Sequence, residues 1–193
     1  MDTVAADVGR IVVIGGAMGL HLNISKCELI THKDQAIFDN LLQSFTRVDI
    51  ADASLLGAPL FHGPALDTAW KKRCDDLALA AERLRDNDIG SQDALILLRS
   101  SFGAPKVLHH LRCALSVSHE ALEVFDRCLR DAIQHITNSN LSDIQWLQAS
   151  LSVKDGGLGV RRVSSLAIPA YVASAASTLS LQAEILSGCT VLG

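Results

Sequence analysis

Aromatic residues are scarce in this sequence, where Phe, Trp and Tyr together make up 4% of 193 residues. Aliphatic side chains supply most of the hydrophobic share, which is 49%. This balance favours helix interiors over stacked sheets, because strands are enriched in aromatic and β-branched residues. We therefore expect a mainly α fold, and the charged share of 20% gives no indication of disorder.

Long apolar runs are also absent, since none reaches the roughly 18 residues that a membrane-spanning helix needs. The first ten residues, MDTVAADVGR, contain acids where a secretory signal has a positive start. We expect an intracellular protein, in the cytoplasm or nucleus, without a membrane partner. The net charge of −4 argues against a protein held to nucleic acid by bulk electrostatics, so any such contact must be local.

The sequence contains no CxxC pair, and its five cysteines are widely spaced. An odd number of separated cysteines is typical of a reducing compartment, and buried thiols are the expected state. His109 and His110 with Cys113 are the nearest approach to a metal-ligand cluster. Adjacent histidines diverge on a helix, however, so we expect no metal site.

The segment LLGAPLFHGPA places two glycines and two prolines close together, which interrupts regular structure. We place a domain boundary there, near Gly63. Residues 1–62 are expected to contain a helix near 4–18 and strands near 27–31 and 47–50. Residues 63–193 read as a helical bundle, in which the first helix presents one apolar face. That face contains Leu66, Trp70, Leu77, Ala81 and Leu84.

The later helices have recognisable start and stop signals. Ser91 and Ser118 are expected to cap two of them, and Pro105 is expected near the start of a third. KDGGLGVR, residues 154–161, has three glycines, which indicates a sharp bend or a close approach of two backbones. The small residues of YVASAASTLS, residues 171–180, predict a tightly packed helix.

Several segments together resemble one protein family. GLHLNISKCELI, residues 19–30, resembles the GLxLNxxKCE motif that follows the catalytic aspartates in reverse transcriptases of non-LTR retrotransposons. LLGAPL, residues 55–60, is similar to the next family motif, a strand hairpin that grips the primer end. Four further segments resemble, in the same order, the helical region downstream of the palm in this family: ALILLRSSFGAPKVLHHLRCAL, FDRCLRDAI, WLQASLSVKDGGLGVR and AYVAS.

This resemblance covers nearly the whole chain and implies that the chain has two structural regions. Residues 1–62 would be a small α+β palm remnant, and residues 63–193 a thumb-like helical bundle. Gly19 would let the chain leave its helix, Asn23 would fix the loop, and Lys26 would point towards the triphosphate as a general acid. The residues expected to contact nucleic acid are Gly19, Asn23, Lys26, Leu56, Gly57, Lys71, Lys72 and Arg73.

The sequence departs from the family at the catalytic centre. Phosphoryl transfer by two metals needs paired aspartates, which in the family lie upstream of the glycine-leucine motif. No [FY]xDD turn precedes Gly19 here, and RCDD, residues 73–76, lies downstream in a helical pattern. The resemblance therefore implies a chain without catalysis of its own, whose intact parent would use Mg²⁺ and hold a template-primer duplex.

Two alternatives stay open at this point. The chain can be a helical module, derived from a retroelement, that binds protein or nucleic acid. It can also be a dinucleotide-binding oxidoreductase, which requires residues 11–14 to form a strand, although the glycines that follow miss the GxGxxG spacing. The basic residues at 71–73 also fit an ordinary solvated helix face, because acids are interleaved with them.

The apolar residues before position 63 predict an unequal distribution of stability. A helix near 4–18 keeps more apolar side chains than water tolerates, and the two strands have lost neighbours if a palm is cut here. We expect residues 1–62 to be less stable and to drive self-association. Limited proteolysis is then expected to leave a fragment that starts near Gly63.

Overall fold

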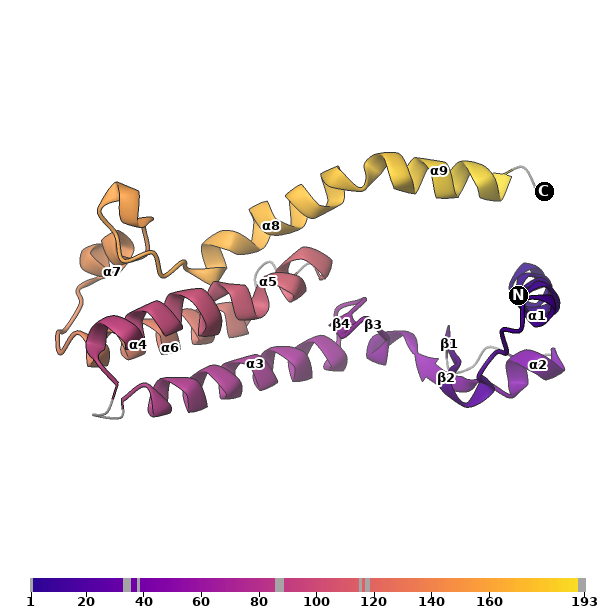
Figure 1. Cartoon of the computed structure of the whole chain (residues 1–193), viewed down its shortest axis with the longest axis horizontal. Helices are drawn as coiled ribbons and strands as arrows, with labels where there is room; N and C mark the ends of the chain where they lie inside the picture. The colour runs from indigo at the N-terminus through magenta and orange to yellow at the C-terminus, as the bar shows by residue number, and fades with distance from the viewer. Residues whose placement is uncertain are drawn as a thin grey trace. The chain divides into compact units, whose positions relative to one another are not determined.

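The computed structural model describes residues 2–32, 36–37, 39–85, 89–114, 116 and 119–190 (Figure 1). Within these residues the chain is mainly helical and its strands are short, as expected from the composition. Two compact units divide it, Met1–Ala53 and Ser54–Gly193.

The N-terminal unit combines one long helix with a small parallel sheet. Residues 11–14 are helical, so the strand that a dinucleotide-binding oxidoreductase requires does not form. Both expected strands are present, and they pair in parallel from Glu28 opposite Thr46 to Thr31 opposite Asp49. The elements in chain order are α1 (Asp2–Ala17), the 3₁₀ turn η1 (Ile24–Lys26), β1 (Glu28–Thr31), α2 (Asn40–Gln43), β2 (Thr46–Asp49) and the 3₁₀ turn η2 (Ile50–Asp52).

This unit has little apolar core among its described residues. Leu42 and Ala53 are buried, but Val13 and Met18 are 73% and 67% exposed. The sheet of β1 and β2 has two strands in the described part of the unit, so each strand has one edge without a neighbouring strand. Parallel sheets normally have more strands and are covered on both faces. The unit is therefore weakly stabilised by its own contacts.

The C-terminal unit begins with a short hairpin and continues as a succession of helices. The elements are β3 (Ser54–Leu55), β4 (Ala58–Pro59), α3 (Pro64–Arg83), α4 (Ser91–Leu97), the π-helix η3 (Leu98–Phe102), α5 (Ala104–Cys113), α6 (Glu120–Ile136), α7 (Asp143–Ala149), the 3₁₀ turn η4 (Val153–Asp155), α8 (Val163–Ser177) and α9 (Leu179–Thr190).

The hairpin moves the boundary between the units away from its expected place. β4 packs against α3 and α5, and Ala58 is 2% exposed. The hairpin thus belongs with the helices, and the units meet between Ala53 and Ser54 instead of near Gly63. Gly63 instead caps α3, with φ of 149° and Pro64 directly after it.

A single core fills the helical unit, and α6 lies at its centre. α6 packs against α3, α4 and α8. Phe125, Leu129 and Ile133 recur along one face of α6 and have no exposed surface. Fully burying one such side chain stabilises a fold by about 1.5–3 kcal/mol. The five residues expected on the apolar face of α3 are all buried in this core, so the helical period of that segment is confirmed.

A buried carboxylate joins α6 to the start of α8. Asp126 is 3% exposed and accepts hydrogen bonds from the Val163 N–H at 2.6 Å and the Ser164 hydroxyl at 2.5 Å. Burial raises the pKa of Asp126, while these hydrogen bonds and nearby Arg162 oppose that rise. Asp126 thus supplies from another helix the acceptor that α8 lacks at its own N-terminus, where Arg162 gives no side-chain cap.

Two of the expected helix caps are wrong by one residue. Ser91 is the first residue of α4, and Gly90 occupies the cap position. His119 caps α6, because its Nδ1 accepts the Ala121 N–H at 3.1 Å, while Ser118 lies outside the described residues. Pro105 stands in the first turn of α5 as expected.

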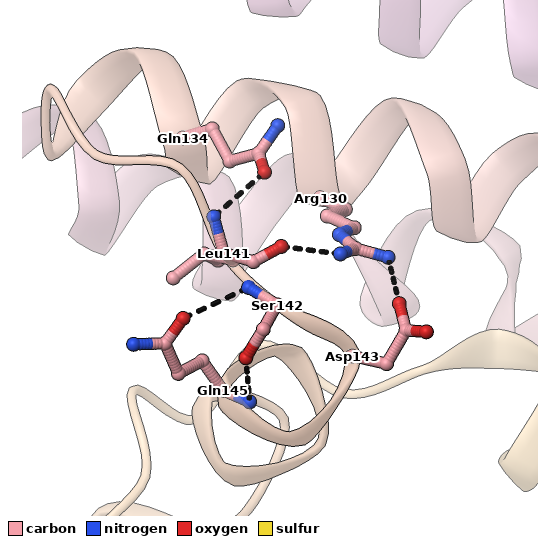
Figure 2. A network of polar contacts seen from close by, with 6 residues as sticks. All are labelled: Arg130, Gln134, Leu141, Ser142, Asp143 and Gln145. Carbon is pink, nitrogen blue, oxygen red and sulfur yellow. Dashed lines mark hydrogen bonds and ion pairs between the residues drawn. The ribbon is translucent and has the colours of Figure 1, made fainter.

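Side chains of α6 hold the connection to α7 (Figure 2). The Gln134 carbonyl oxygen accepts the Leu141 N–H at 2.9 Å, and the Arg130 guanidinium donates to the Leu141 carbonyl. Ser142 and Gln145 then form a reciprocal capping box at the start of α7, with distances of 2.8 and 3.3 Å. These contacts fix the start of α7 against α6, and Trp146 and Ala149 of α7 are buried in the core of the unit.

The final helices are more exposed than their small residues suggested. Ala173, Ala175 and Ala176 of α8 are exposed, as are all side chains of α9 from Leu179 to Ser187. The expectation of a tightly packed helix is therefore wrong for this segment, although the helix itself is present. No single described helix is long and apolar enough to cross a membrane, whereas α8 and α9 together, bent by 47°, reach that length and composition.

The glycine-rich segment after α7 makes the close backbone approach that its composition predicts. Gly156 and Gly159 have positive φ angles of 81° and 76°. A Cβ on Gly157 would lie 2.2 Å from the Leu151 carbonyl oxygen and 2.7 Å from that of Gln148. Only glycine fits there without movement of the backbone.

Gly157→Ala is therefore expected to destabilise the helical unit by about 2–3 kcal/mol, since the clash is with backbone. Gly90→Ala is the matched control, because its added Cβ would meet only the Asp93 carboxylate, at 3.7 Å. Urea unfolding followed by circular dichroism measures both. Equal stability of the two variants would contradict the close approach at Gly157.

Candidate nucleic-acid interface

Gly19 ends α1 in the manner expected of a turning point. Its φ is +79°, a conformation that glycine adopts without strain. The Leu20 N–H donates to the Gly15 carbonyl at 2.8 Å, and the Gly19 N–H donates to the Gly16 carbonyl at 3.1 Å. This pair of bonds is a Schellman motif, which satisfies the last carbonyls of the helix and redirects the chain.

Asn23 organises the loop that follows. Its carbonyl accepts the Lys26 N–H at 3.0 Å and the Cys27 thiol at 3.3 Å. Its side-chain oxygen accepts the Ser25 hydroxyl at 2.7 Å. Lys26 is the last residue of the turn η1 and is exposed, so its ammonium is presented to solvent by a loop with fixed backbone.

Leu56 and Gly57 form the tip of the hairpin. Both have positive φ, 52° and 78°, as a two-residue type I′ turn requires. This conformation is uncommon for leucine, and its side chain is 86% exposed. Backbone strain at an exposed apolar tip is typical of a binding position.

A histidine of α5 anchors that tip. The Nε2–H of His109 donates to the Leu56 carbonyl at 3.2 Å. The sequence indicates His109 only as a candidate metal ligand, because nothing local links it to a residue so distant along the chain. Together with the burial of β4 on α3 and α5, this bond mounts the hairpin on the helical unit.

The basic residues of α3 differ from one another. Lys71 and Lys72 are exposed, whereas Arg73 is half-buried and lies 3.6 Å from the Asp76 carboxylate. Successive helix positions lie about 100° apart, so the three side chains do not share one face. Lys71 and Lys72 are therefore the cations of this segment that are available to a phosphate.

The structure brings together only part of the expected set. Leu56, Gly57, Lys71, Lys72 and Arg73 all belong to the C-terminal unit, at its hairpin and on α3. Gly19, Asn23 and Lys26 belong to the N-terminal unit.

A polar cluster that the sequence did not indicate lies beside the first half of α3. The Trp70 indole N–H donates to the buried Ser116 hydroxyl at 3.1 Å, and the His119 ring lies 3.0 Å from the Asp67 carboxylate. His110 is 2% exposed, and its Nδ1 has no hydrogen-bond partner among the described residues. Burial lowers the pKa of His110, with further contributions from the charges of Arg73 and His109.

The cysteines whose side chains the structure describes are less buried than expected. Cys113 is exposed, and Cys27, Cys74 and Cys128 are half-buried free thiols. Burial raises the pKa of Cys74 to about 11, assisted by Cys128 and Asp75, so this thiol is unreactive at neutral pH.

Metal-ligating groups do not gather in the described part of the chain. No cluster of three or more His, Cys, Asp or Glu side chains there has the geometry to hold an ion.

Acid is expected to destabilise the helical unit through His110. The unfolded chain takes up a proton near the ordinary pKa of about 6.5, while folded His110 resists protonation. Its contribution is present in full above that pH and is lost as the pH falls towards the lowered folded value, by at most about 1.4 kcal/mol per pH unit. Urea unfolding at several pH values between neutral and mildly acidic should show a smaller loss in His110→Leu. Equal slopes in both proteins would contradict this role.

The comparisons with known proteins return no relative. No family model matches the chain, and no curated protein or solved structure matches it either. A functional assignment for this chain therefore depends on its own motifs and geometry.

Proposed function

We propose that this chain corresponds to the carboxyl-terminal palm and thumb-like helical region of a non-LTR retroelement reverse transcriptase, and that it contacts a template-primer duplex. The observation that carries the proposal is the order of the family-like segments. GLHLNISKCELI comes first, LLGAPL second, and the helical segments follow as in the family. One such segment has little specificity, whereas their shared order is far more specific.

The geometry of the first segment supports this proposal. The family motif requires a glycine that turns the chain out of a helix and a loop that presents a lysine. Gly19 makes that turn, and Asn23 fixes the loop that ends in exposed Lys26. In an intact palm, Lys26 would face the triphosphate and donate a proton to the leaving pyrophosphate.

The second segment supports it through shape. LLGAPL forms an antiparallel hairpin, β3 and β4, as the primer-gripping motif of the family does. Its exposed tip at Leu56 offers an apolar contact to a sugar or base, and the His109 bond holds the tip on the helical unit.

Charge supports a local contact. The net charge of −4 opposes broad attraction to nucleic acid, so affinity must come from particular cations. Lys71 and Lys72 lie exposed on α3, the helix against which β4 packs. They are suited to neutralise phosphates of a duplex held at the hairpin.

A second candidate function is a protein-interaction module derived from a retroelement. The exposed apolar side chains of α8 and α9 favour it, for example Leu179 at 61% and Leu186 at 66%. Exposed apolar patches on a protein often mark a site where another protein binds.

Salt titration of binding to a fluorescent primed RNA–DNA duplex tests the proposed function. Each phosphate contact adds close to one unit of slope to the plot of log affinity against log salt. Lys71→Gln combined with Lys72→Gln is expected to weaken binding across all sequences and to reduce the slope by about 1–2. The same chain is expected to incorporate no nucleotide on this template with Mg²⁺.

Lys154→Gln is the matched control, because Lys154 is exposed in η4, outside the proposed interface. It should leave the slope unchanged. Absence of saturable binding would refute the duplex contact. Binding that does not depend on salt would favour apolar association, the second candidate function.

A further inference from the structure

An apolar groove lies at the C-terminal half of α3, and neither the hairpin nor Lys71 or Lys72 lines it. Its volume is about 350 Å³, and its lining comes from α3, Ile89, α4, the π-helix and the start of α5. Leu79 and Leu97 line it and remain 50% and 38% exposed. The groove is therefore open along one side, and an occupant would cover both leucines.

An irregular helix forms one wall of this groove. α4 continues into the π-helix Leu98–Phe102, in which the wider turn ends with the Gly103 N–H donating to the Leu98 carbonyl at 2.7 Å. Phe102, the last residue of the π-helix, lines the groove. Single π-turns cost stability and occur often at functional sites, so their position next to a groove points to a binding role.

The charges at the groove are unbalanced. Arg83 and Lys106 line it and are exposed, and neither forms an ion pair with a described residue. Asp76 also lines it, but its carboxylate lies 3.6 Å from the Arg73 guanidinium. The groove thus has an apolar lining and two exposed cations that have no ion-pair partner among the described residues.

We propose that this groove binds an amphipathic helix of a partner protein, with a stripe of leucine-like residues in the groove and acidic residues beside Arg83 and Lys106. A helix in a groove is recognised through apolar anchors at i, i+3, i+4 and i+7. The open side favours a helix over a small molecule, because small-molecule sites bury most of their ligand. The flanking charges then select acidic partners over basic ones.

Fluorescence anisotropy with designed helical peptides tests this proposal on the full chain. One labelled peptide carries leucines at the anchor positions and glutamates beside them, and a second has lysines in place of the glutamates. The acidic peptide is expected to bind more tightly. Leu79→Ser should weaken it by about tenfold, and Arg83→Glu with Lys106→Glu should reverse the preference between the peptides.

Ile144→Ser is the matched control, since Ile144 is 80% exposed on α7 and does not line the groove. It should leave the affinity unchanged. Failure of the acidic peptide to saturate, or an equal loss in the control, would overturn the proposal. Sedimentation that shows a dimer dissolved by Leu79→Ser would also overturn it, because a second copy would then be the occupant. Tight binding of dodecanoate that the peptide cannot displace would also overturn the proposal, because a small apolar acid would then be the occupant.

Discussion

Burial of the apolar face of α6 is the constraint on which the helical unit depends. Phe125, Leu129 and Ile133 have no exposed surface, and α3, α4 and α8 pack around them. The same helix supplies Asp126 to the start of α8, and Arg130 and Gln134 to the connection with α7. Apolar burial on one side and directed polar contacts on the other thus place every later helix that touches α6.

The hairpin inherits its position from this core. α3 contributes Trp70 to the core and supports β4, and α5 supplies His109 to the hairpin tip. A strained, exposed turn at Leu56 persists only because rigid helices hold it. The N-terminal unit has no comparable support, since its described buried apolar residues are few and α1 leaves Val13 and Ile14 exposed. Lys26 is therefore presented by a well-fixed loop in a poorly stabilised unit.

Features set by local pattern could be predicted from the sequence. The helical period of α3 indicated its buried face, including Leu66 and Trp70. The glycines and prolines of residues 55–65 indicated an interruption of regular structure, while the hairpin was expected only from the family resemblance. The glycines around Gly157 indicated a close approach of two backbone segments, because only glycine leaves room for one. Gly19 and Asn23 were identified through a resemblance, and their hydrogen bonds now give each a physical role in the loop.

Features set by contacts between distant segments could not be predicted. The domain boundary lies between Ala53 and Ser54, before the expected position near Gly63, because β4 packs on α3 and α5. No local sequence signal indicates this packing. The bond from His109 to Leu56 joins residues far apart along the chain. The composition of residues 98–102 does not indicate a π-helix. The exposure of α8 depends on which elements pack against it and not on its small residues.

We expect the helical unit around α6 to be stable by itself and residues 1–53 not to be. Hydrogen exchange of the intact chain, followed by mass spectrometry, tests it most directly. The amides of α6 and α3 should exchange slowest, at the rate of global unfolding, while those of α1 and of the sheet exchange several orders of magnitude faster. Protection of α1 and β1 equal to that of α6, or loss of α6 protection first, would contradict the account.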